Sequence, residues 1–73
     1  MLYALSFTDK QALLRIYMSK GFEFNKAKEM VTKMNQNQMD MGKELRSKQK
    51  SEVEIKLKLQ DKFQEEFMKL CAE

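Results

Sequence analysis

Apolar residues in the first third of the chain recur at the spacing of a helix. Leu13 precedes Ile16 and Tyr17 by three and four positions, so the three side chains share one helical face. A face of this kind packs against another apolar surface and leaves the opposite face to water. The pattern predicts a short helix over about residues 8–19.

Both ends of this first helix carry recognisable signals. Thr8 is followed three positions later by Gln11, which is the spacing of a capping box at a helix N-terminus. Gly21 stands just beyond the last turn, where helices often end on a residue in the left-handed conformation. We therefore expect the helix to begin at Thr8 and a turn to occupy residues 20–25.

A longer apolar seam follows Asn25, which is a plausible helix cap. The segment from Asn35 to Gly42 opposes a continuous helix, because its amides are weak helix formers and glycine costs up to about 1 kcal/mol relative to alanine. A continuous helix is favoured because the apolar residues before and after this segment fall on the same face of one straight helix. The polar Gln38 interrupts that apolar face. The pattern predicts a helix over about 25–72 that is either continuous or broken once between Asn35 and Gly42. The seam consists of Met30, Met34, Met41 and Leu45.

Residues 53–59 alternate strictly between apolar and charged, which is typical of a strand. If this segment is a strand, its partner is the other alternating run, residues 2–7. Acidic residues that precede basic ones by four positions favour a helix instead, and so does a C-terminal apolar stripe with helical spacing. The acid-base pairs are Glu44 with Lys48, Glu52 with Lys56, Glu54 with Lys58, and Glu65 with Lys69, and the stripe is Leu59, Phe63, Phe67 and Leu70.

These segments predict one small all-α domain over residues 1–73. A helix over 25–72 would be roughly 70 Å long, far more than a helix over 8–19 can cover. We therefore expect a helical hairpin or bundle that dimerisation completes, with methionines outside the seam, Met39 and Met68, adding to the surface that a partner could cover. The predicted protein-binding residues are Met30, Met34, Met41, Leu45, Leu59, Phe63, Phe67 and Leu70.

The composition argues against catalysis and against a bound cofactor or metal. The chain has seven methionines, no histidine and one cysteine, Cys71, so it offers no imidazole base and no cysteine pair for zinc. Glu65 and Glu66 are adjacent and would point about 100° apart on a helix, which does not suit an acid-base pair. We expect a non-enzymatic protein. A single thiol and the lack of a leader or a long apolar stretch lead us to expect a cytoplasmic protein that does not enter membranes.

A basic cluster in the middle of the chain is the feature that suggests nucleic acid. Lys43, Arg46 and Lys50 align at spacings of three and four on a helix, where they could follow a phosphate backbone or contact an acidic partner. A solvated helical face is the other interpretation. The cluster contains no aromatic residue, so base stacking is not indicated.

The first half of the chain also resembles the ribbon-helix-helix repressors. MLYALSF, TDKQALLRIYMSKG and FEFNKAKEMVTKM follow one another as strand, helix, glycine turn and second helix. The resemblance implies an intertwined dimer that reads the major groove of DNA with a paired strand. The alternate positions of the family's strand are usually polar or basic, whereas here they are Leu2, Ala4 and Ser6 or Tyr3, Leu5 and Phe7.

The sequence thus leads to two functional hypotheses. The first is a non-enzymatic regulator or adaptor, a helical module like a small inhibitor or chaperone, that binds another protein through apolar, methionine-rich faces. The second is a DNA-binding transcriptional regulator of the ribbon-helix-helix or basic-helix kind. Salt distinguishes them, since phosphate contacts weaken steeply with ionic strength and an apolar interface does not.

Overall fold

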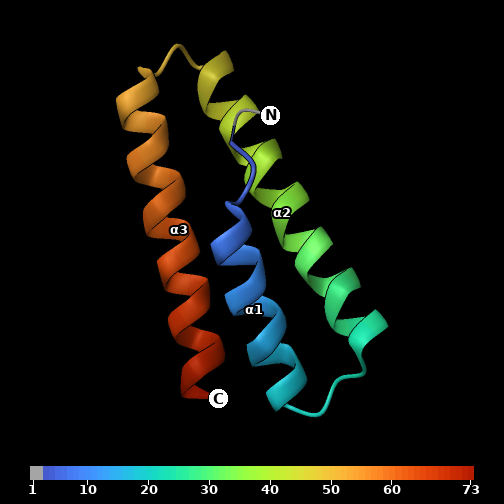
Figure 1. The fold of residues 1–73 in the computed structure, drawn as a ribbon. Coiled ribbons are helices and arrows are strands. Elements are labelled where there is room, and N and C mark those ends of the chain that lie inside the picture. Colours follow the sequence, from blue (N-terminus) through green and yellow to red (C-terminus); the bar gives the residue numbers. More distant parts are fainter. Residues whose placement is uncertain (1–2) are drawn as a thin grey trace.

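The computed structural model describes residues 3–73, which form three helices and no strand. In chain order these are α1 (Phe7–Ser19), α2 (Phe24–Ser47) and α3 (Glu52–Ala72) (Figure 1). The all-helical prediction is confirmed, and residues 53–59 are helical despite their alternating pattern. The strand partner proposed for them, residues 2–7, does not form a strand over its described part, and Leu2 lies outside the described residues.

The first helix ends where the sequence indicates but begins one residue earlier. Ser6, not Thr8, is the N-cap, and its hydroxyl accepts a hydrogen bond from the Asp9 amide at 3.1 Å. The predicted Thr8 capping box is therefore wrong, because Ser6 also offers a side-chain oxygen at the correct distance. Gly21 has φ +99°, as expected for a residue that closes a helix.

The turn after α1 is a Schellman motif that carries its own hydrophobic contact. The Phe22 amide donates to the Tyr17 carbonyl at 3.3 Å, and the two rings meet edge-on with centroids 6.0 Å apart. The next helix begins at Phe24, so the turn is shorter than predicted. Glu23 occupies the N-cap position without a side-chain bond, and Asn25, the predicted cap, lies inside the first turn.

The second break lies at residues 48–51 rather than between Asn35 and Gly42. Gln49 adopts a left-handed φ of 61°, and the Lys50 amide donates to the Leu45 carbonyl at 3.2 Å, which closes α2. Ser51 then caps α3 by accepting a hydrogen bond from the Glu54 amide at 3.2 Å. The predicted single helix over 25–72 and the predicted break at 35–42 are both wrong, because the Ser-x-x-Glu start signal at Ser51, nine residues after Gly42, determines the turn.

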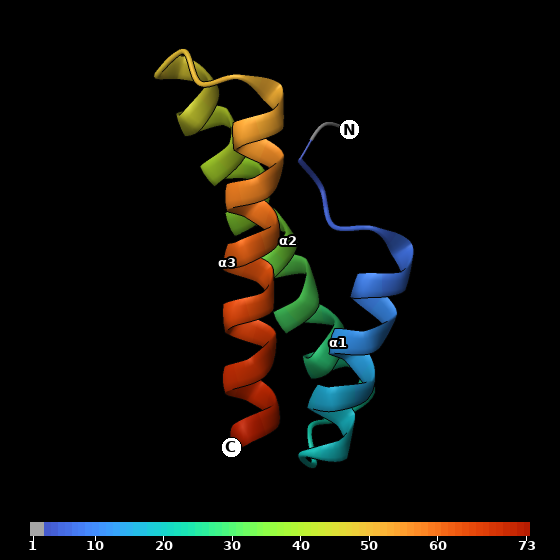
Figure 2. The same cartoon turned by 90° about the vertical axis from the view of Figure 1, so that its left-hand side faces the viewer.

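This turn sends α3 back along α2, and α1 packs against only one half of the pair (Figures 1 and 2). The hydrophobic core is accordingly divided in two. The three-helix core contains Leu13, Tyr17, Ala27 and Val31. The two-helix core contains Leu45, Ile55 and Leu59.

Residues 3–6, the N-terminal segment, continue beyond the start of α1, and Tyr3 packs against the two-helix core while Leu5 packs against the three-helix core. The Leu5 amide donates to Asn35 Oδ1 at 2.7 Å, and the Tyr3 hydroxyl donates to the Glu52 carboxylate at 3.1 Å. The Tyr3 ring lies against Gly42, where an added Cβ would clash with Tyr3 Cγ. Gly42 therefore leaves α2 intact and provides the space in which the N-terminal segment docks.

Candidate functional site

The residues predicted to bind a partner lie mainly between the helices of this chain. Leu45 and Leu59 are buried in the two-helix core, and Met41 is half-buried against it. The remaining five are half-buried against the three-helix core. They are Met30, Met34, Phe63, Phe67 and Leu70. The seam that was expected to require a second copy is thus largely covered by α3, and its protein-binding role remains a prediction.

The apolar side chains left exposed on α3 form a different surface. Val53 is 69% exposed, Leu57 56% and Met68 69%. At about 100° per residue the three lie within an arc of about 60°, and the exposed Cys71 falls on the same side. We call Val53, Leu57, Met68 and Cys71 the outer α3 face. The sequence contained a signal for it, since Val53 and Leu57 stand four apart and Met68 lies outside the stripe that packs inward.

The basic cluster lies at the end of α2 and in the turn that follows. Lys43, Arg46 and Lys50 are all exposed. Carboxylates lie close by: Lys50 Nζ is 3.9 Å from Glu54 Oε1, and a neighbouring pair joins Glu44 to Lys48 at 3.3 Å. Such exposed pairs contribute about 0–1 kcal/mol each. The cluster is therefore a solvated, partly neutralised surface, and its binding to nucleic acid stays a hypothesis.

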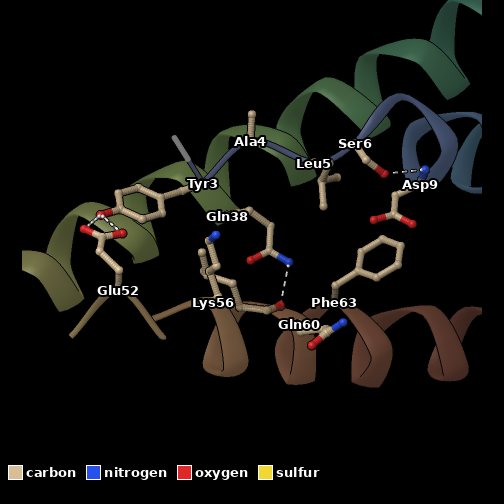
Figure 3. Close-up of a pocket in the computed structure, with 11 residues that line it drawn as sticks. Tyr3, Ala4, Leu5, Ser6, Asp9, Gln38, Glu52, Lys56, Gln60 and Phe63 are labelled. Atoms are coloured by element: carbon tan, nitrogen blue, oxygen red, sulfur yellow. Dashed lines mark hydrogen bonds between the residues drawn. The ribbon is translucent and has the colours of Figure 1, made fainter. Parts of the chain in front are cut away.

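A groove of about 490 Å³ opens between the N-terminal segment and α3 (Figure 3). It exists because α1 begins only at Phe7, so the non-helical residues 3–6 cover a stretch that a helix covers elsewhere. Leu5, Leu59 and Phe63 supply apolar walls. The polar and charged residues that also line the groove are Ser6, Asp9, Gln38, Glu52, Lys56 and Gln60.

Gln38 is the buried polar residue of this groove and lies between the two cores. It is 5% exposed, and its Nε2 donates to the Leu59 carbonyl at 3.2 Å. Its Oε1 is buried and has no hydrogen-bond partner among residues 3–73. A buried acceptor without a donor costs about 1–3 kcal/mol, so the bundle tolerates a local polar defect at this position.

Among the titratable groups of the described residues, Tyr17 is the one whose pKa is clearly shifted. Burial, with smaller contributions from Glu66 and Glu73, raises the pKa of Tyr17 above its ordinary value of 10.0. This tyrosine therefore stays protonated at neutral pH and acts as a core residue. Residues 3–73 contain no group of three or more potential metal ligands. None of the helices in this part of the chain combines the length and apolarity that a membrane crossing requires.

Comparison with known proteins adds no functional information. No protein-family model matches the chain, and neither curated proteins nor solved structures give a match. The features of the molecule that bear on its function are therefore the outer α3 face, the basic cluster and the groove.

Proposed function

We propose that this protein is a non-enzymatic protein-binding module, a small regulator or adaptor, and that it binds through the outer α3 face. The observation that supports the proposal is the exposure of Val53, Leu57 and Met68 on one side of a single helix. Scattered exposed apolar residues are ordinary on protein surfaces, but a row at helical spacing suits the pairing of two amphipathic helices.

The partner we propose is a second copy of the chain, with its α3 antiparallel to the first. Pairing two α3 helices about residue 62 places Val53 opposite Cys71 of the second copy, and it brings Leu57 within one residue of the position opposite Met68. Lys58 then faces Glu65 across the contact, so opposite charges flank the apolar row.

Light scattering at micromolar concentration tests the assembly. The wild type should be a dimer, and the double variant Leu57→Ser, Met68→Ser should be a monomer with an unchanged helical circular dichroism spectrum. Phe7→Ser is the matched control, because it removes a still more exposed apolar side chain from α1 and should leave the dimer intact. A monomeric wild type would contradict self-association.

Cross-linking tests the orientation. An antiparallel pair separates the two Cys71 thiols by about 27 Å along the helix, so the wild type should not form a disulfide on mild oxidation. Val53→Cys should cross-link to Cys71 of the second copy. Lys28→Cys, on α2, should not. Efficient cross-linking of the wild type through Cys71 would indicate a parallel arrangement instead.

Nucleic-acid binding through Lys43, Arg46 and Lys50 is the competing proposal, which their shared exposure supports. Replacing all three with glutamine should leave dimerisation unchanged if the outer α3 face carries the function. Fluorescence anisotropy with duplex DNA provides the second measurement. Tight binding that weakens steeply with salt in the wild type and is lost in the triple variant would favour the competing proposal.

A further inference from the structure

The groove beside the N-terminal segment combines two features that are independent of the outer α3 face. One is its volume of about 490 Å³, within the range of about 300–1,000 Å³ typical of small-molecule sites. The other is Gln38 Oε1, a nearly fully buried acceptor that no donor in residues 3–73 satisfies. A bound molecule that presents a donor at this point would remove the cost of the unpaired oxygen.

The residues around the groove restrict the chemistry of such a molecule. Phe63 and Tyr3 contribute aromatic side chains and Leu5 an aliphatic one, which suit a flat apolar body (Figure 3). Asp9, Glu52 and Lys56 place charges of both signs around the opening, so neither an anion nor a cation is favoured.

We propose that this groove binds an uncharged aromatic molecule whose hydrogen-bond donor reaches Gln38 Oε1. The oxygen has less than 1 Å² of exposed surface in the structure. The donor therefore reaches it after a side chain of the groove wall turns aside. Lys56 is suited to this movement because it lines the groove and is itself exposed. The N–H or O–H of the ligand then donates to the amide oxygen, while Gln38 Nε2 keeps its bond to the Leu59 carbonyl.

Indole and benzofuran form a matched pair of probes for this site. The two rings have nearly the same shape, but indole carries an N–H donor where benzofuran carries an oxygen. Titrating each into isotope-labelled protein and following amide chemical shifts locates the binding and gives its affinity. We expect saturable shifts at Gln38, Leu5 and Phe63, with indole bound about three- to tenfold more tightly than benzofuran, the ratio that one hydrogen bond supplies.

Two variants separate the hydrogen bond from the apolar walls. Gln38→Leu removes the acceptor at similar volume and should abolish the preference for indole while both probes still bind. Gln38→Met is a second replacement without the amide, and it should behave in the same way if leucine disturbs the fold. Met68→Ser, on the outer α3 face, should leave both affinities unchanged, which makes this result independent of the proposed dimer.

Four results would overturn the proposal. The first is the absence of saturable shifts with either probe, and the second is equal affinity of the wild type for both. The third is a preference for indole that survives both Gln38→Leu and Gln38→Met. Saturable shifts confined to residues away from the groove would likewise place the binding elsewhere and contradict it.

Discussion

The α2–α3 pair is covered by a helix in one half of the molecule and by a short non-helical segment in the other. In one half α1 covers the α2–α3 pair, and Leu13 and Ala27 are completely buried. In the other half only the N-terminal segment covers the pair, and a groove remains beside it. Four non-helical residues bury less apolar surface than a helix does, so the two-helix half should be the less stable one.

Two residues inside α2, the polar Gln38 and the small Gly42, have different structural roles. Gln38 lies at the boundary between the cores and leaves one acceptor unpaired. Gly42 lies within the two-helix half, where its missing side chain admits the Tyr3 ring. Both residues look like weaknesses of a helix in the sequence. In the structure, one marks where the cores separate and the other fixes the N-terminal segment.

Truncating one core residue in each half should give the largest effect. Leu13→Ala and Ile55→Ala each remove a fully buried side chain, for which costs of about 2–5 kcal/mol are usual. We expect Leu13→Ala to lie towards the upper end, because three helices surround it, and Ile55→Ala towards the lower end. Urea unfolding followed by circular dichroism measures both. A larger loss from Ile55→Ala would reverse the ranking of the two halves.

Gly42→Ala should reveal how firmly the N-terminal segment is held. The added methyl group displaces the Tyr3 ring, so we expect a loss of about 1–2 kcal/mol although alanine is the better helix former. In a Tyr3→Ala background the same substitution should stabilise the protein by up to about 1 kcal/mol. Chemical unfolding of the four proteins completes the cycle. A stabilising Gly42→Ala in the wild type would show that the Tyr3 contact contributes little.

Gln38→Leu should join the two cores and raise the stability. The substitution removes the unpaired acceptor and loses one bond, from Nε2 to the Leu59 carbonyl, so a net gain of about 1 kcal/mol is expected. Thermal unfolding monitored at one protein concentration measures the change. Asn37→Leu, at the neighbouring exposed position, is the control and should have little effect. A destabilised Gln38→Leu would mean that the amide makes a further favourable interaction.

The smallest effect concerns Tyr17 and alkaline pH. Its pKa is raised in the folded state, so the unfolded chain loses this proton first as the pH increases. The contribution to stability is complete below the ordinary pKa of 10.0 and declines as the pH rises towards the folded pKa. Urea unfolding across this range should show a steeper decline for the wild type than for Tyr17→Phe. Identical slopes would contradict the raised pKa.

Local sequence signals predicted the helices better than their boundaries. The Leu13, Ile16 and Tyr17 face and the left-handed Gly21 were readable because each depends on neighbours within a few positions. The turn at 48–51 was missed because its left-handed residue is Gln49, a residue type that rarely signals such a conformation. The Ser51 and Glu54 pair was the available signal, and the alternating pattern that follows obscured it.

The groove could not be predicted from the sequence, although one of the residues that line it, Gln38, stood out there. Gln38 could be recognised as a polar interruption of an apolar seam. Its partner, the Leu59 carbonyl, is 21 residues away, and the pairing depends on where α2 turns back. The docking of Tyr3 on Gly42 is likewise a long-range contact. Helix propensity alone marks Gly42 as a possible break in the helix, whereas in the structure it accommodates the Tyr3 ring.

Native-state hydrogen exchange, measured residue by residue, tests most directly whether the two-helix half is less stable than the three-helix half. We predict that the amides of Leu13, Val31 and Phe67 exchange only through global unfolding. Those of Leu5, Leu45 and Ile55 should exchange through a smaller opening that releases the N-terminal segment and the two-helix core. Equal opening free energies in both halves, or stronger protection around Ile55 than around Leu13, would contradict the account.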